Sequence, residues 1–181
     1  TALPTTMVLY ISYRYNWDAQ MIGVTMAVVG VSTLIVQGLL IRRFVTWFGE
    51  RAALYTGFIL GAVGFVAVGL APTGSWLWVA LCILSLWGLA GPAVMAIMSK
   101  HVEPTEQGQL QGANASIMGV ASMIGPAIFT LTYAAAIDPK NGFDQPGVPF
   151  LLAALFLIAA MGTAWLTLRR VTDVPARQAG G

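Results

Sequence analysis

Residues 21–41 read MIGVTMAVVGVSTLIVQGLLI, an unbroken apolar stretch in which Gln37 is the only amide and no side chain is charged. A helix needs about 20 consecutive apolar residues to cross the hydrocarbon core of a bilayer, and this stretch has that length. Four more runs of the same kind follow, at 52–71, 76–98, 113–137 and 149–168. None alternates strictly as the strands of an outer-membrane barrel do, and each is about twice as long as such a strand. The sequence therefore predicts an all-α polytopic membrane protein with five complete transmembrane helices.

The composition of the whole chain supports this class. Of its 181 residues, 57% are apolar and only 9% are charged, and the mean hydropathy is +0.78. A soluble domain carries about 25% charged residues. A shorter apolar stretch at 1–12 would form a helix of about 18 Å, which is too short to cross a bilayer and reads as the end of a sixth helix. Because the chain begins with Thr1 and lacks the basic region of a signal peptide, we expect its N-terminus to be cut.

Basic residues are distributed unequally between the two sides of the predicted bundle. Loops that join successive helices alternate sides, so seven basic residues fall on one side and two on the other. The seven are Arg42, Arg43, Arg51, Lys100, Arg169, Arg170 and Arg177, and the two are Arg14 and Lys140. Basic residues concentrate on the cytoplasmic side of membrane proteins, which predicts cytoplasmic loops at 42–51 and 99–112 and a cytoplasmic C-terminus. This bias accounts for the net charge of +2 and leaves no basic patch for a nucleic-acid partner.

Polar side chains inside the runs indicate which helices line a cavity. They concentrate in the first, third and fourth runs, whereas those of the second and fifth lie near the ends. An unpaired polar group is costly in hydrocarbon, so we expect the first set to border a cavity and the second and fifth runs to face lipid. The candidate cavity residues are Thr25, Ser32, Thr33, Gln37, Ser85, Trp87, Asn114 and Ser122. A hydrogen bond between helices is the competing explanation for any single hydroxyl, and a packed core position is the competing explanation for Trp87.

Glycine and proline modify the runs in two ways. Gly57, Gly61 and Gly64 share one face of the second run, where small residues let another helix approach closely. Two Gly-Pro pairs each remove a backbone donor within a run and are expected to kink or break their helices, which would suit a transporter. The helix-break candidates are Gly91, Pro92, Gly125 and Pro126.

No run carries a side chain suited to acid–base or metal chemistry. Asp, Glu, His, Lys and Arg, which serve in general acid–base catalysis and proton relays, are absent from all five runs. The single histidine, His101, has only Glu103 and Glu106 near it in sequence, and Cys82 is the only cysteine, so no metal site is predicted. The chain also lacks a Walker-type glycine loop. The sequence therefore predicts no enzyme, no ATP-driven pump and no bound cofactor.

Several motifs occur in the order and spacing of one transporter family. EQGQLQG at 106–112 and GPAIFT at 125–130 closely resemble the segment that joins transmembrane helices 10 and 11 of bacterial tetracycline-efflux transporters of the major facilitator superfamily. WDA at 17–19, IG at 22–23, Gln37, GER at 49–51 and GPA at 91–93 match the family in the same order. The resemblance covers essentially the whole chain.

This resemblance implies an architecture and a function. Members of the family have two six-helix repeats with a central cavity between them, so the five runs would be helices 8 to 12 and residues 1–12 the outer end of helix 7. Residues 1–168 would form the C-terminal repeat, and 169–181 a cytoplasmic tail. Family members export a drug, carried as a complex with a divalent cation, across the bacterial cytoplasmic (inner) membrane in exchange for a proton. The implied partners are the missing N-terminal half, the lipid bilayer and a small amphipathic drug, with the proton gradient as the energy source.

The resemblance also implies roles for particular residues. Gln37 matches a glutamine associated with drug handling, whereas Thr33 stands where many tetracycline exporters have a histidine, which would alter proton coupling or substrate choice. The counterpart of the superfamily's gating loop lacks the family aspartate but keeps the basic character; its candidate residues are Arg42, Arg43, Gly49 and Arg51. Two alternatives stay open. One is a transporter of the same superfamily for another drug or metabolite, and the other is a non-transporting or dimeric half-size membrane protein.

Overall fold

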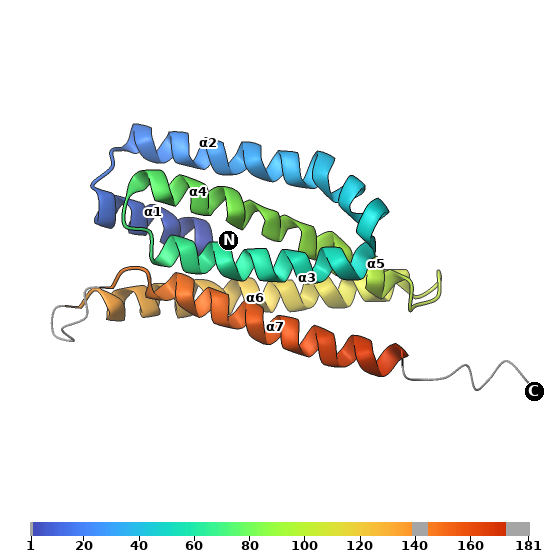
Figure 1. Ribbon diagram of the computed structural model, residues 1–181. Helices are drawn as coiled ribbons and strands as arrows, with labels where there is room; N and C mark the ends of the chain where they lie inside the picture. Colours follow the sequence, from blue (N-terminus) through green and yellow to red (C-terminus); the bar gives the residue numbers. More distant parts are fainter. Residues whose placement is uncertain (1, 139–144, 173–181) are drawn as a thin grey trace, which may run out of the picture.

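The computed structural model describes residues 2–138 and 145–172, and the regular elements in these two ranges are all helical (Figure 1). The elements are α1 Ala2–Tyr15, α2 Ala19–Ile35, the π-helix η1 Val36–Leu40, α3 Ile41–Gly69, α4 Gly74–Ser85, the 3₁₀-helix η2 Leu86–Leu89, α5 Ala90–Ser99, α6 Gln107–Ala136 and α7 Val148–Thr172. Successive crossings alternate in direction along one bundle, with α4, η2 and α5 forming one of them (Figure 1). The predicted all-α class is confirmed.

The described residues contain four helical stretches that are long and apolar enough to cross a membrane. The first, Ala19–Gly69, has 51 residues and would extend about 76 Å if it were straight, more than twice the thickness of a hydrocarbon core. It turns back at Gly49, whose φ of 81° and ψ of 169° are not helical, and α2 and α3 run in opposite directions (Figure 1). This stretch therefore makes two crossings, and the five predicted complete spans are present.

Two loops predicted from the sequence are helical over part of their length. In the segment 42–51, the chain stays helical up to Gly49, and the Thr46 hydroxyl donates to the Arg42 carbonyl at 2.7 Å. α6 begins at Gln107, so the end of the predicted loop 99–112 is helical as well. The predicted runs were too short because they end where polar residues begin, whereas a helix can continue into the polar interface until a backbone signal ends it. At Gly49 that signal is a positive φ, which glycine adopts without strain.

α3 is the most extensively packed helix of the bundle. It contacts α4, η2 and α5 as well as α7, and it buries Leu54, Phe65 and Val68. Ile59 and Val63 on the same helix are exposed. The expectation that the second run faces lipid is therefore wrong for one side of α3. On that side the glycine face of the run lets the neighbouring helices approach.

That glycine face brings α3 into backbone contact with the next crossing. A Cβ atom added at Gly57 would lie 2.7 Å from the Ala90 nitrogen, and one added at Gly64 would lie 2.7 Å from the Leu84 Cα atom. Both distances are too short for any side chain to fit without moving the neighbouring backbone. The prediction of a close helix approach at these glycines is confirmed.

The two Gly-Pro pairs have different effects. α6 passes through Pro126 without interruption, so the break expected at Gly125-Pro126 is absent; one missing donor is tolerated inside a long helix when its neighbouring turns are intact. At Gly91-Pro92 the regular helix is disturbed one turn earlier, in the 3₁₀-helix η2. Pro92 has no N–H to donate to the Gly88 carbonyl, which accounts for the irregular turn at that place.

Hydrogen bonds join the end of α1 to the C-terminal end of α3 and the residues that follow it. The Tyr10 hydroxyl donates to the Val68 carbonyl at 2.8 Å, and Arg14 and Tyr15 both donate to the Ala71 carbonyl, at 3.0 and 2.8 Å. A cation near the C-terminal end of a helix also complements the helix dipole. The stretch predicted at 1–12 is thus the main part of a 14-residue helix that is held firmly in place.

Candidate functional site

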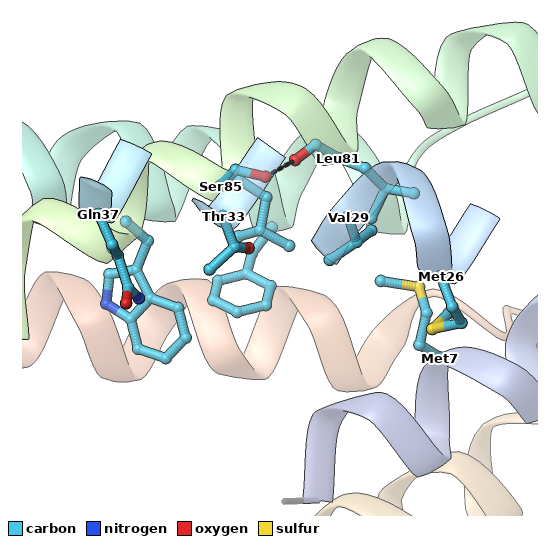
Figure 2. A pocket seen from close by; sticks show the side chains of 11 residues that line it. Met7, Met26, Val29, Thr33, Gln37, Leu81 and Ser85 are labelled. Atoms are coloured by element: carbon cyan, nitrogen blue, oxygen red, sulfur yellow. Dashed lines mark hydrogen bonds between the residues drawn. The ribbon is translucent and has the colours of Figure 1, made fainter. Parts of the chain in front are cut away.

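A cavity of about 400 Å³ lies between the first two complete crossings of the bundle and the third (Figure 2). Side chains from α1, α2, η1, α3, α4 and η2 line it. They are Met7, Met26, Val29, Thr33, Gln37, Phe65, Leu81, Leu84, Ser85, Trp87 and Gly88. An apolar wall with a few polar groups at this volume is typical of a site for a small organic molecule.

Two of the polar side chains in the cavity wall are free to bind a ligand. Ser85 is not one of them, because its hydroxyl donates to the Leu81 carbonyl at 2.9 Å (Figure 2). Within the described ranges, no hydrogen bond engages the Thr33 hydroxyl or the Gln37 amide. These two residues lie four positions apart, on the side of α2 and η1 that borders the cavity.

Trp87 is both packed and open to the cavity. Its ring contacts Phe65 edge-to-face, with ring centroids 5.6 Å apart, and a Cβ atom added at Gly61 would lie 3.0 Å from the indole Cδ1 atom. The side chain nevertheless keeps 38% of its surface exposed. Its indole N–H has no partner among the residues that the structure describes. The side chain is therefore packed against its neighbours and borders the cavity as well.

Two irregular helical segments meet beside the cavity. The π-helix η1 contacts the 3₁₀-helix η2, and a Cβ atom added at Gly88 would lie 3.6 Å from both Cγ and Nε2 of Gln37. Single π-turns within membrane and soluble helices occur frequently at functional sites. The sequence pattern does not predict η1, although the spacing of Met26, Val29, Thr33 and Gln37 places these four cavity residues on one helix face.

Two candidates on α2 serve helix packing instead. Thr25 is completely buried; its hydroxyl donates to the Met21 carbonyl at 2.9 Å and accepts from the Trp78 indole nitrogen at 3.3 Å. Ser32 lies with its oxygen 4.0 Å from the sulfur of Cys82 on α4. Both residues lie outside the cavity wall, so hydrogen bonding between helices, the competing explanation, holds for Thr25.

The structure does not bring the two α6 candidates to this cavity. The Asn114 amide lies 3.8 Å from the Met118 sulfur, and the Ser122 hydroxyl donates to the Gly119 carbonyl at 2.8 Å, both within α6. α6 packs mainly against α1 and α7 rather than against α2 and α4. The first, third and fourth apolar runs were all expected to line a cavity. Only the first and the third supply polar residues to this cavity.

The gating-loop candidates belong to the segment that joins α2 to the main part of α3, which lies at the opposite end of the bundle from the connection between α1 and α2 (Figure 1). Arg42 and Arg43 lie on the helical segment before the turn at Gly49, and Arg51 follows it; all three arginines are exposed. Between them, the carboxylate of Glu50 pairs with Lys100 at the end of α5, at 2.8 Å. Two further basic residues of the predicted asymmetry, Lys140 and Arg177, lie outside the described residues.

No cluster of metal-ligating side chains stands beside these groups. Within residues 2–138 and 145–172, no three of His, Cys, Asp and Glu come together in a way that could hold a metal ion.

Comparisons with known proteins agree with the all-α membrane fold. The family model described as the Major Facilitator Superfamily matches residues 1–181. The chain is 33% identical over 145 residues to the tetracycline resistance protein of class C from Escherichia coli, an alignment that covers 80% of this chain and 36% of the relative. It is 34% identical over 143 residues to the class E protein of the same organism, covering 78% of this chain and 35% of the relative.

A mouse protein also matches, the Hippocampus abundant transcript-like protein 1, at 22% identity over 164 residues, or 83% of this chain and 32% of the relative. No solved structure matches. The chain spans about a third of the length of these curated relatives. The match along the full chain, the helical bundle and its apolar crossings show that this multi-pass membrane protein belongs to the major facilitator superfamily.

Proposed function

We propose that residues 1–168 form the C-terminal repeat of a drug exporter that carries tetracycline-like molecules, and that 169–181 form its cytoplasmic tail. One observation carries the proposal: the Thr33 hydroxyl, the Gln37 amide and the Trp87 indole border one apolar cavity and have no hydrogen-bond partner in the described structure. The apolar wall would hold the body of an amphipathic molecule, while these three groups would orient its polar edge. The names of the bacterial relatives support a tetracycline-like substrate.

The transport cycle that we propose exchanges the drug for a proton. The five apolar runs contain no Asp, Glu, His, Lys or Arg, so the groups that carry the proton would lie in a partnering N-terminal repeat. The oxygen atoms of Thr33 and Gln37 are hard donors, which suits a substrate that travels as a complex with a divalent cation. The bundle end with Arg42, Arg43 and Arg51 would face the cytoplasm of a bacterium, with the protein in its inner membrane.

Transport by the full-length protein in proteoliposomes tests this function. With an imposed pH gradient and Mg²⁺ present, we expect tetracycline to accumulate and to leak away when the gradient is collapsed. Accumulation that ignores the gradient would exclude antiport. We expect Gln37→Ala to reduce the rate several-fold, while Gln111→Ala, which removes an exposed amide on α6 outside the cavity, should leave it unchanged. Equal rates in the two variants would contradict the assignment of this cavity.

A second candidate function is transport of another drug or metabolite by the same cavity. Thr33 is the observation that favours it, because this position lacks the histidine implied by the tetracycline-exporter resemblance. The match to a mouse protein whose name does not mention tetracycline points the same way. Resistance profiling of cells that express the full-length gene separates the two functions: protection against tetracycline alone supports the first, and protection against other compounds without tetracycline supports the second.

A further inference from the structure

The bundle end where α2 turns into α3 exposes aromatic rings beside arginines. Trp47 and Phe48 are 75% and 61% exposed, the first of these among the largest exposures of any apolar side chain in the described structure. Arg42, Arg43 and Arg51 are exposed as well. These five residues are called the basic–aromatic surface below.

The helical geometry places cations and rings together on this surface. The hydrogen bond from Thr46 to the Arg42 carbonyl shows that the turn is helical. Arg43 and Trp47 are four residues apart and therefore share one face of it. The ring of Phe48 packs on Phe44, with ring centroids 4.9 Å apart, which fixes the orientation of the second exposed ring. The surface is thus a regular helical turn that carries Arg43 and Trp47 on one face.

The positive charge of the basic–aromatic surface is not compensated within the described part of the chain. Arg42, Arg43 and Arg51 make no ion pair there. The neighbouring carboxylate of Glu50 is already paired with Lys100 at 2.8 Å and only 20% of its side chain is exposed. The surface therefore presents three cations to an anionic partner.

A stack of a cation on an indole lies where α7 ends, at the same end of the bundle (Figure 1). The guanidinium carbon of Arg169 lies 3.7 Å from the centre of the Trp165 ring. Ala164 and Leu168 each precede one of these two residues and pack against a small apolar core. Phe44 on α3 packs against the same core, which consists of Ala53, Leu54, Ala90 and Ala93. The N-terminal part of α3 and the C-terminal part of α7 thus place cations and exposed indole rings beside this apolar core.

We propose that the basic–aromatic surface binds the headgroups of anionic phospholipids in the leaflet that it faces. A guanidinium group matches a phosphate with paired hydrogen bonds, and indole and phenyl rings favour the depth at which headgroups meet acyl chains. A soluble acidic protein would explain the arginines but not Trp47 and Phe48, which lie where transmembrane helices leave the hydrocarbon. Lipid bound here would contact the turn at Gly49 that joins the first two complete crossings. This proposal does not depend on the identity of the transported molecule.

Lipid retention by the full-length protein tests the proposal. The protein is reconstituted into nanodiscs with equal amounts of phosphatidylglycerol and phosphatidylcholine, released into detergent, and analysed by native mass spectrometry for the lipids that remain bound. We expect phosphatidylglycerol to be enriched several-fold, and the enrichment to fall as salt is raised. The double variant Arg42→Gln/Arg43→Gln should lose most of the enrichment, and Trp47→Ala should lower it further in that background.

Arg14→Gln is the matched control, because it removes one positive charge at the other end of the bundle while the Ala71 carbonyl keeps its hydrogen bond from Tyr15. The control should retain phosphatidylglycerol as the wild type does. Since Arg42 and Arg43 are exposed, the double variant should also keep the wild-type thermal transition, which is measured in parallel. Equal enrichment in the double variant and the wild type, or equal loss in the Arg14 variant, would overturn the proposal.

Discussion

Replacing Gly64 by alanine should destabilise the bundle, whereas the same replacement at Gly162 should stabilise it. A Cβ atom at Gly64 would lie 2.7 Å from Cα, 2.8 Å from the nitrogen and 2.9 Å from Cβ of Leu84. Two of these three atoms belong to the backbone of α4 and cannot rotate away. To restore an ordinary carbon–carbon contact, α3 and α4 would have to separate by roughly 1 Å.

The magnitude follows from two opposing effects. Overpacking a tight contact costs about 1–3 kcal/mol, while replacing glycine by alanine inside a helix gains about 0.5–1 kcal/mol. At Gly64 the sum is a loss of stability of about 1–2 kcal/mol. At Gly162 no atom lies within 4 Å of the added Cβ, so only the gain of about 0.5–1 kcal/mol applies. The two substitutions should therefore differ in sign.

Unfolding of the full-length protein in detergent, followed by circular dichroism, measures the difference. We expect the order of stability Gly162→Ala, wild type, Gly64→Ala. Gly57→Ala should also be less stable than the wild type, because its Cβ atom would lie 2.7 Å from the backbone nitrogen of Ala90. A Gly64→Ala protein as stable as the wild type would show that α3 and α4 are not in backbone contact, which would refute the packing on which the cavity wall rests.

Three further substitutions test single contacts, each by the same unfolding measurement. Gly49→Ala should cost about 1–2 kcal/mol, since a side chain is strained at the φ of 81° found there; no change would mean that the turn adopts another conformation. Thr25→Val should cost about 1–3 kcal/mol, because it leaves the Trp78 indole without its acceptor, and a neutral effect would argue against that bond. Tyr10→Phe should cost about 1 kcal/mol through loss of the buried bond to the Val68 carbonyl; a stabilised protein would contradict it.

The crossings could be predicted from the sequence, and their ends could not. Uncharged runs of about 20 residues report how much of a helix lies in hydrocarbon, and the five runs correspond to the observed crossings. They do not report how far a helix continues into the interface. α6 starts at Gln107 and the segment after Leu40 stays helical up to Gly49, because amides and arginines are good helix formers outside the hydrocarbon.

The candidate site was predictable in part, for a related reason. Thr33, Gln37, Ser85 and Trp87 do line the cavity, because a polar residue in a crossing must face something other than lipid. Residue type cannot tell a hydroxyl that faces a neighbouring helix from one that faces a cavity, so Thr25 was assigned to the wrong group. The π-helix η1 has no characteristic composition, and its position follows only from how α2 and α3 pack.

The same hydrogen bond that removes Thr25 from the cavity explains why a cavity exists farther along α2. Thr25 and Trp78 join α2 to α4 at one end, and η1 contacts η2 at the other, where Val36 is only 5% exposed. Thr33 lies between these two fixed points, and there its hydroxyl has no partner in the described structure. We therefore expect the two junctions, together with the side chains that line the wall, to set the width of the cavity. Substitutions at the Thr25 junction should change substrate affinity without touching the substrate, whereas Ser32, beside Cys82 and outside the cavity wall, should tolerate replacement by alanine.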